Sequence, residues 1–340
     1  MRLASSSDSK GWDNYLLHTR NRTLAHRWSW GEILASSFGV KPYYFIAERE
    51  NSIVGILPTT LMKSRLFGSF LISLPWLDYG GPIADNDEIA LCLVDTAIET
   101  ASENNCSFLE LRAVSHRLEG LREKADKFTF LLDLQSGEED VWKSFNAKAR
   151  NQVRKAEKSG LTVLFGDSDL LAEFYKVFAR NMRDLGTPVW PKELFEEIFY
   201  HFPNDTEIAA VEYKSKIVAA ALILHYGDYS IVPSASSYRE YRRLCPNNIM
   251  YWEIIKHCIS RGSILFDFGR SSEGAGTYHF KKQWVKKPTQ QIWQYKLLST
   301  NTLPELNPRN PKYRLAINIW SKMPLSIANF LGPKIITKLP

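Results

Sequence analysis

The sequence has no clustered metal-binding residues and none of the common nucleophile or nucleotide motifs. Its four cysteines form no C-x-x-C pair, and its seven histidines form no H-x-x-x-H pair. Metal sites usually show such spacings, so we predict no metal site and expect the cysteines to be buried thiols. G-x-S-x-G and Walker loops are also missing, which argues against the hydrolase and nucleotide-triphosphatase classes that use them.

Long hydrophobic runs are also missing. The longest aliphatic stretch, residues 217–224, is far shorter than the roughly 20 residues of a membrane-spanning helix. Residues 1–8 place no apolar run behind their charge, so we expect no secretory signal and a cytoplasmic location. The chain has 340 residues, of which 44% are hydrophobic and 24% charged, and this predicts a globular protein with two domains.

The formal net charge of +6 is concentrated at one end of the chain. Residues 301–340 contribute six basic side chains and one acidic side chain, which leaves a charge of only +1 for residues 1–300. The total charge is therefore no argument that the body binds nucleic acid, and any such argument depends on a local patch.

Two internal similarities predict a duplicated module. Residues 48–54 and 212–218 each place a short charged turn between two apolar runs, which is typical of a β-hairpin. A helical pattern followed by a strand pattern then occurs in both halves, at residues 88–104 with 107–112 and at residues 248–260 with 263–268. Each half therefore combines helices, a meander of strands, and a helix that leads into a further strand.

This repeat predicts an α/β (α+β) protein with two tandem modules, each a mixed sheet flanked by helices. We place the first domain at residues 1–138 and the second at 139–300, because acidic residues at 138–140 favour the start of a helix there. Residues 301–340 form a separate basic tail. One helix is expected after the boundary, with an apolar stripe formed by Trp142, Phe145, Ala149, Val153 and Ala156.

The other side of that helix is strongly basic. Arg150, Arg154 and Lys158 recur every four residues, so they lie on one face, where like charges repel by about a few tenths of a kcal/mol per pair. One interpretation is a solvated basic surface. The other is an anion site that binds a substrate diphosphate or a tRNA backbone.

The segment from Phe266 to Trp284 is the strongest candidate for a site. A strand places Asp267 near its end, Gly269 permits a sharp turn, and an aromatic and basic helical pattern follows a glycine-rich stretch. We predict that Lys281 stabilises an oxyanion or a phosphate and that Asp267 orients an attacking amine. The alternative is that Asp267 and Arg270 form a structural ion pair and the lysines lie on the surface.

Residues 266–270 and 276–284 together resemble the signature of FemAB-like proteins, particularly those associated with exopolysaccharide and exosortase systems. Residues 148–158 are similar to the basic helix that opens the second domain in this family, and residues 75–82 are similar to a turn of its first domain. The resemblance covers about residues 10–300 and agrees with the duplicated module.

The resemblance implies two GNAT-like acyltransferase domains that transfer an acyl group, typically an amino acid from aminoacyl-tRNA, to an amine on a cell-wall precursor. Lys281 matches the family position implicated in the reaction, and Arg150 and Arg154 match basic positions suited to the phosphates of the acceptor. The long helical hairpin of some Fem transferases is missing, which weakens any transfer of their mode of tRNA binding. The full set of predicted substrate-binding residues is Arg150, Arg154, Lys158, Tyr238, Arg270, Tyr278, Lys282 and Tyr79.

Three functions stay open at this point. Acyl-CoA is an alternative donor, but residues 238–248, where a GNAT pyrophosphate loop would lie, contain no glycine. A helix N-terminus near Asn247 and Asn248, with Arg242 and Arg243, could still hold a phosphate. The third alternative is an inactive module that binds a glycan precursor. We expect no cofactor beyond the co-substrate, aminoacyl-tRNA or acyl-CoA.

The basic tail has an amphipathic pattern. Tyr313, Ala316, Ile317, Trp320 and Met323 fall on one helical stripe, and a second apolar segment follows with basic residues interspersed. This pattern suits a helix in the interface of an anionic membrane, and it equally suits docking onto the body of the protein. Peripheral contact with the inner membrane through residues 312–331 is therefore one of two alternatives.

Overall fold

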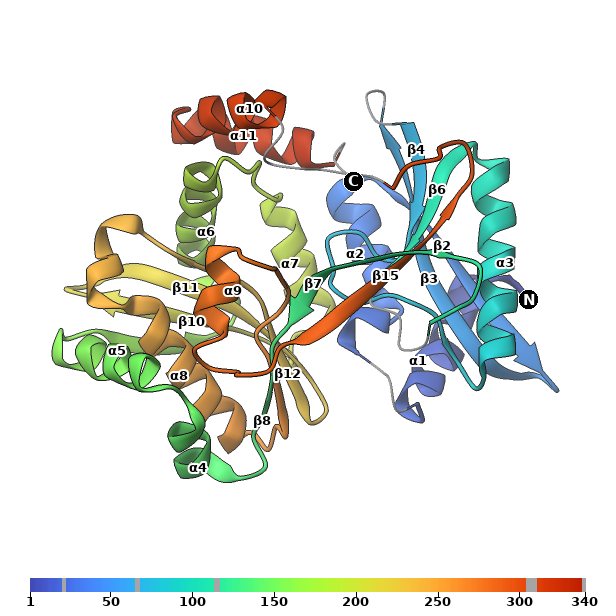
Figure 1. The fold of residues 1–340 in the computed structure, drawn as a ribbon. Helices are drawn as coiled ribbons and strands as arrows, with labels where there is room; N and C mark the ends of the chain where they lie inside the picture. The colour runs from blue at the N-terminus through green and yellow to red at the C-terminus, as the bar shows by residue number, and fades with distance from the viewer. Residues whose placement is uncertain (20–22, 65–67, 113–116, 304–310, 338–340) are drawn as a thin grey trace. The chain divides into compact units, whose positions relative to one another are not determined.

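The computed structural model describes residues 1–19, 23–64, 68–112, 117–303 and 311–337, and the side chains from residue 314 onward in the last range. It divides into two compact units (Figure 1). Unit 1 comprises Met1–Asp126, Gln291–Asn307 and Lys334–Pro340, and unit 2 comprises Lys127–Gln290 and Pro308–Pro333.

Unit 1 is a mixed sheet flanked by helices. Its strands follow the order β1-β2-β3-β4-β6-β15, and β5 pairs with β3. The elements in chain order are β1 (Arg2–Leu3), α1 (Ser9–Leu17), α2 (Ser29–Phe38), β2 (Lys41–Arg49), β3 (Ser52–Ser64), β4 (Gly68–Ile72), β5 (Ile83–Ala84), α3 (Asp87–Glu103), β6 (Cys106–Leu111), the first part of β7 (Arg122–Thr129), and β15 (Thr289–Leu297).

Unit 2 contains a sheet in the order β8-β13-β12-β11-β10-β9, also flanked by helices. The end of β7 belongs to this unit and pairs with β14. The elements are β8 (Leu131–Asp133), α4 (Gly137–Ser144), α5 (Ala147–Lys158), β9 (Thr162–Gly166), α6 (Leu171–Leu185), α7 (Lys192–His201), β10 (Thr206–Tyr213), β11 (Lys216–Tyr226), β12 (Tyr229–Ser237), α8 (Pro246–Ser260), β13 (Leu265–Asp267), β14 (Ser271–Ser272), α9 (Gly276–Lys281), α10 (Pro311–Ser321) and α11 (Leu325–Ile336).

The two units repeat one topology, which confirms the predicted duplication. In unit 1, β2, β3 and β4 are antiparallel, and α3 leads into β6, which runs parallel to β4. In unit 2, β10, β11 and β12 are antiparallel, and α8 leads into β13, which runs parallel to β12. The two predicted hairpins even share a turn geometry, because Glu50, Asn51, Lys214 and Ser215 all have positive φ, as a type I′ turn requires.

The boundaries of the units differ from those expected from the sequence. Residues 291–300 were assigned to the second domain, yet Gln291–Asn307 belongs to unit 1, because β15 pairs with β6 from Gln294 opposite Leu111 to Leu297 opposite Phe108. Such a long-range pairing leaves no local signal in the sequence. The cysteines also differ in part: Cys106 and Cys258 are buried, whereas Cys92 is exposed and Cys245 is half-buried.

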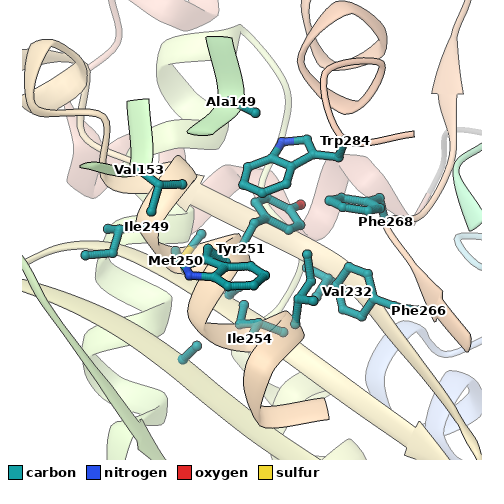
Figure 2. Packing of buried hydrophobic residues seen from close by; sticks show 14 of the residues in the cluster. Ala149, Val153, Val232, Ile249, Met250, Tyr251, Ile254, Phe266, Phe268 and Trp284 are labelled. Atoms are coloured by element: carbon teal, nitrogen blue, oxygen red, sulfur yellow. The ribbon is translucent and has the colours of Figure 1, made fainter. Parts of the chain in front are cut away.

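The core of unit 2 lies between its sheet and α5 and α8. Figure 2 shows Ala149 and Val153 of α5 above α8, and Tyr251 of α8 beside Phe268 and Trp284. The rings of Tyr251 and Phe268 stack with centroids 5.1 Å apart. The Phe266–Trp284 segment supplies several of these rings. Its polar residues are therefore anchored to a rigid, closely packed core.

A polar cluster is centred on Glu207, near the start of β10. Its Oε2 is 2.6 Å from His257 Nε2 and 3.5 Å from His225 Nε2, and its Oε1 accepts a hydrogen bond from Arg261 at 3.0 Å. Contacts with His225 and His257 hold the pKa of Glu207 far below its ordinary range. The cluster ties β10 to α8 and to the residues after it.

This depressed pKa predicts a pH-dependent contribution to stability. A carboxylate with a lowered pKa in the folded state stabilises that state above its unfolded pKa, and the contribution is lost as the pH falls toward the folded value. Urea unfolding should therefore show wild type more stable than Glu207→Gln at pH 5.5, with the difference shrinking below about pH 4.3. A difference that is constant down to pH 3.5 would contradict the assignment.

Candidate active site

The basic segment is divided into two helices rather than the single helix expected from its apolar stripe. Helix α4 ends at Ser144, and α5 begins at Ala147 after Asn146, whose side-chain oxygen accepts a hydrogen bond from Ala149 N at 2.8 Å. An asparagine cap of this kind starts a new helix, and the stripe continues across the break because Phe145 is buried beside it. The prediction of a single helix is therefore wrong. The basic residues still lie together on one side of the segment.

The three basic residues of α5 are used differently. Arg150 is half-buried, and its Nη1 donates to the carbonyls of Lys143, at 3.0 Å, and Phe145. These carbonyls lie at the C-terminus of α4, so Arg150 helps to hold the break. Arg154 and Lys158 are exposed, with the Arg154 guanidinium 5.7 Å from the centre of the Trp142 ring. Both are therefore accessible to an anionic ligand.

The junction between α4 and α5 contacts the Phe266–Trp284 segment directly. The backbone N–H of Asn146 donates to the carbonyl of Gln283 at 3.3 Å, and the Phe145 and Trp284 rings meet edge to face with centroids 4.9 Å apart. The structure thus brings together the start of α5 and the end of α9, which the sequence separates by more than 130 positions. Both segments carry local signals, but nothing in the sequence predicts that they touch.

Asp267, at the end of β13, is completely buried. Its Oδ1 accepts hydrogen bonds from Thr129 Oγ1 at 2.6 Å and Gly269 N at 2.8 Å, and its Oδ2 accepts one from Tyr229 OH at 2.7 Å. A buried carboxylate that accepts several short hydrogen bonds is stabilised in its charged form. Because no surface of Asp267 reaches solvent, the structure favours a role in fixing the turn at Gly269 over direct contact with a substrate amine.

Lys281, at the end of α9, is held against the same turn. Its side chain is buried, and its Nζ donates to the carbonyl oxygens of Gly269 at 2.8 Å and Arg270 at 3.0 Å. Gly269 has a φ of 73°, the left-handed region that glycine adopts without strain. Asp267 thus binds the amide of Gly269 while Lys281 binds its carbonyl, so the two predicted catalytic residues fix one turn from both sides.

The other predicted substrate-binding residues of unit 2 lie in several environments. Tyr278 is buried, with its ring packed edge-on against Phe128 and Phe130, so it belongs to the core. Lys282 is exposed and lies 5.7 Å from the centre of the Tyr278 ring, and Arg270 is half-buried. The alternative interpretation placed the lysines of this segment on the surface. That placement is confirmed for Lys282 and is wrong for Lys281.

Tyr238 and Tyr79 lie outside the cluster around the Gly269 turn. Tyr238 follows β12, and the Arg180 guanidinium and the Lys216 ammonium lie 4.8 and 5.5 Å from the centre of its ring. Burial raises the pKa of Tyr238, so it is a neutral phenol at physiological pH. Tyr79 is a half-buried residue of unit 1.

Three further residues of this region, Thr129, Tyr229 and Tyr251, are not predicted from the sequence. The first two complete the hydrogen bonds of Asp267 from strands far away in the sequence. Burial and the charge of Asp267 raise the pKa of Tyr251 well above its ordinary value, so its hydroxyl stays protonated. No local motif marks these residues, and only the pairing of β12 with β13 could have pointed to Tyr229.

The pairing of β12 with β13 is short. Tyr229, Ser230 and Ile231 pair with Leu265, Phe266 and Asp267, whereas β12 itself continues to Ser237. Strand β12 then leads through residues 239–244 into α8, whose first residue is Pro246. The Gly269 turn therefore follows immediately after the last paired residue of β13. In an open α/β sheet, ligands bind at such strand ends.

Residues 143–282 match the family model described as an acetyltransferase (GNAT) domain. A lipid II:glycine glycyltransferase of Staphylococcus epidermidis is 26% identical to the chain over 124 residues, which are 33% of this chain and 30% of the relative. The crystal structure of FemX has a TM-score of 0.68 at 16% identity, covering 93% of this chain and 100% of that one. The matched segment is a GNAT-type acyltransferase domain, and the chain resembles FemAB-like proteins. The recognition made from its motifs is confirmed.

The predicted fold of the FemAB-like chain is confirmed as well. A tandem GNAT protein from the clavulanic acid biosynthesis pathway has a TM-score of 0.56 at 9% identity, covering 88% of this chain and 98% of that one. The matched GNAT segment extends from Lys143 to Lys282, so it includes α5, the Gly269 turn and Lys281. This places the domain in an acyltransferase class. The alignment with the glycyltransferase spans only 30% of the length of that relative.

Proposed function

We propose that the chain is a FemAB-type acyltransferase that forms an amide. It transfers an aminoacyl group from aminoacyl-tRNA to an amine on a cell-envelope or exopolysaccharide precursor. The observation that carries this proposal is the contact of α5 with the end of α9 inside the matched GNAT segment, because it joins a basic surface to the turn held by Lys281. The similarity to a lipid II:glycine glycyltransferase supports a peptidoglycan precursor as the acceptor.

The reaction requires one bond to form and one to break. The acceptor amine attacks the carbonyl carbon of the donor ester, a C–N bond forms, and the C–O bond to the tRNA ribose breaks. The amine loses a proton, and the leaving hydroxyl takes one up. Negative charge develops on the carbonyl oxygen, and a fixed donor beside that position lowers the barrier. We assign this role to Lys281, whose ammonium the carbonyls of Gly269 and Arg270 hold in place.

The exposed basic side chains of α5 are proposed to bind the phosphates of the acceptor. Replacing Arg154 and Lys158 by glutamine should raise KM for a diphosphate-linked acceptor about ten-fold or more, because a hydrogen bond to a charged group contributes about 1.5–3 kcal/mol. The maximal rate should change little, since neither residue contacts the Gly269 turn among the described contacts. Steady-state kinetics at varied acceptor concentration measure both constants.

Lys192→Gln is the matched control, because Lys192 is a partly exposed lysine of α7 in the same unit, paired with Glu196 at 2.7 Å. It should leave KM unchanged. If Arg154→Gln and Lys158→Gln also leave KM unchanged, α5 is a solvated basic face and the acceptor binds elsewhere.

Acyl-CoA is the second candidate donor. The observation in its favour is the start of α8, which follows Arg242 and Arg243 in the segment after β12, because a helix N-terminus beside basic side chains can bind a pyrophosphate. The two donors are separated by incubating the protein with charged tRNA and, in parallel, with acyl-CoA, and by following donor loss on addition of envelope precursors. Consumption of the thioester alone would replace the tRNA proposal. Binding of a precursor without loss of either donor would favour an inactive binding module.

A cytoplasmic location is part of this proposal, because charged tRNA and the precursors of envelope glycans are made there. A lipid-linked acceptor would be met at the inner surface of the membrane, so we also propose peripheral contact with that surface through residues 312–331. Among the residues that the structure describes, no helix is long and apolar enough to cross a bilayer.

A further inference from the structure

The helices of the tail are attached to unit 2 by one face each. On α10, Trp320 is buried and Ile317 lies against Gly186 at the end of α6. Just after α10, the carbonyl of Met323 accepts a hydrogen bond from Arg183 Nη1 at 2.8 Å. On α11, Ala328 is buried, and Gly332 meets Val189 so closely that a Cβ would lie 2.8 Å from its backbone nitrogen. Docking onto the body therefore occurs, and it uses only part of the apolar surface.

Four large apolar side chains of the tail face solvent. Leu315 and Ile319 of α10 are 62% and 58% exposed, and Ile327 and Phe330 of α11 are 46% and 65% exposed. Their spacings of four and three residues place each pair on one side of its helix, away from the docked residues. Large apolar side chains repeated in this way on a surface indicate a partner.

The charge around these side chains selects the partner. No acidic residue occurs between Pro311 and Pro340, whereas Arg314 and Lys322 are exposed beside the apolar side chains of α10. An apolar surface bordered by basic residues suits the interface of an anionic membrane, where apolar side chains enter the acyl boundary and basic ones contact lipid phosphates.

A pocket with a volume of 660 Å³ opens beside this surface. It is lined by Leu185 and Asp184 of α6 and by residues of α10 that include Arg314 and Leu315. Asp184 has partners of its own, because Arg183 Nε lies 2.8 Å from its carboxylate. Arg314 is thus positioned at the junction of a pocket and an exposed apolar helix face, as a side chain that contacts a lipid phosphate would be.

We propose that α10 and α11 bind the surface of an anionic membrane through Leu315, Ile319, Ile327 and Phe330, with Arg314 and Lys322 contacting lipid phosphates. This names the residues of the membrane contact that belongs to the proposed function, and it would place the acyltransferase domain at the surface that carries a lipid-linked acceptor. Membrane binding itself needs neither donor nor acceptor, so the two proposals fail separately.

Co-sedimentation of the full chain with phosphatidylcholine vesicles, with and without phosphatidylglycerol, tests this proposal. Wild type should bind the anionic vesicles preferentially. Replacing the four apolar residues by serine should lower the partition constant about ten-fold or more, and Arg314→Gln and Lys322→Gln should each lower it about five-fold. Tyr200→Ser, at a 79% exposed residue of α7, should have no effect.

Two further measurements complete the test. Turnover of a water-soluble acceptor by the four-serine variant should equal that of wild type, which shows that the variant is folded and separates membrane binding from catalysis. Equal vesicle binding by wild type and the four-serine variant would overturn the inference while leaving the proposed function intact. A wild-type dimer that becomes monomeric in the four-serine variant, without vesicle binding by either, would assign the surface to a second copy of the chain instead.

Discussion

Replacing Lys281 by alanine should lower the rate of acyl transfer about 10²- to 10³-fold, the usual effect of removing one donor to a developing oxyanion. The ammonium is held by the carbonyls of Gly269 and Arg270, at 2.8 and 3.0 Å, so its position is set before a substrate binds. The loss should appear in kcat rather than in KM, because the charge that Lys281 stabilises develops during the reaction. Single-turnover kinetics with saturating donor measure it directly.

Lys286→Ala is the matched control for this variant. Lys286 lies five residues further along the chain and carries the same charge, but it is exposed where Lys281 is buried. It should retain the rate of wild type within a small factor. Since Lys281 also fixes a turn, the unfolding of Lys281→Ala must be followed in parallel. A folded Lys281→Ala protein with an unchanged rate would remove the residue from the reaction.

Replacing Asp267 by alanine should destabilise the protein by about 3 kcal/mol or more, since each buried donor left without an acceptor costs about 1–3 kcal/mol. The donors concerned are Thr129 Oγ1, Tyr229 OH and Gly269 N, all within 2.8 Å of the carboxylate. Urea unfolding measures the loss. Asp267→Asn retains one oxygen acceptor and should lose less stability than Asp267→Ala.

The same pair of variants separates positioning from direct chemistry. If Asp267 acts by fixing the turn at Gly269, the stability and the rate of the two variants should fall in the same order. The pH profile of the remaining activity should also keep its shape. A folded Asp267→Asn protein that loses all turnover and shows an altered pH profile would show instead that the carboxylate takes part in proton transfer.

Most of the secondary structure could be predicted because its signals are local. The turns at residues 50–51 and 214–215, and the strands on either side of them, follow from charged residues between apolar runs. The break between α4 and α5 could not be predicted in this way, because Phe145 continues the apolar stripe and only the cap at Asn146 marks a new helix. The place of β15 beside β6 was hidden for a related reason, since pairing partners far apart in the chain leave no local pattern.

The candidate site shows the same division. Residue types and order identified Asp267 and Lys281, and the family resemblance gave Lys281 a role. Their common attachment to the backbone of Gly269 required the structure. The buried carboxylate of Asp267 also accepts hydrogen bonds from Thr129 and Tyr229, which come from other strands of unit 2. The basic residues of α5 also differ in their exposure to solvent. Arg154 and Lys158 face solvent, whereas Arg150 binds the carbonyls at the end of α4.

The central claim is that this FemAB-like chain forms an amide by using the basic helix α5 and the turn held by Lys281 as one site. The most direct test is to supply purified protein with tRNA charged with a labelled amino acid and an envelope precursor that carries a free amine. Label should appear in the precursor and survive mild alkali, which hydrolyses the ester of the donor and leaves an amide intact. Label that stays on the tRNA, while labelled acyl-CoA or no donor at all reacts with the same precursor, would contradict the account.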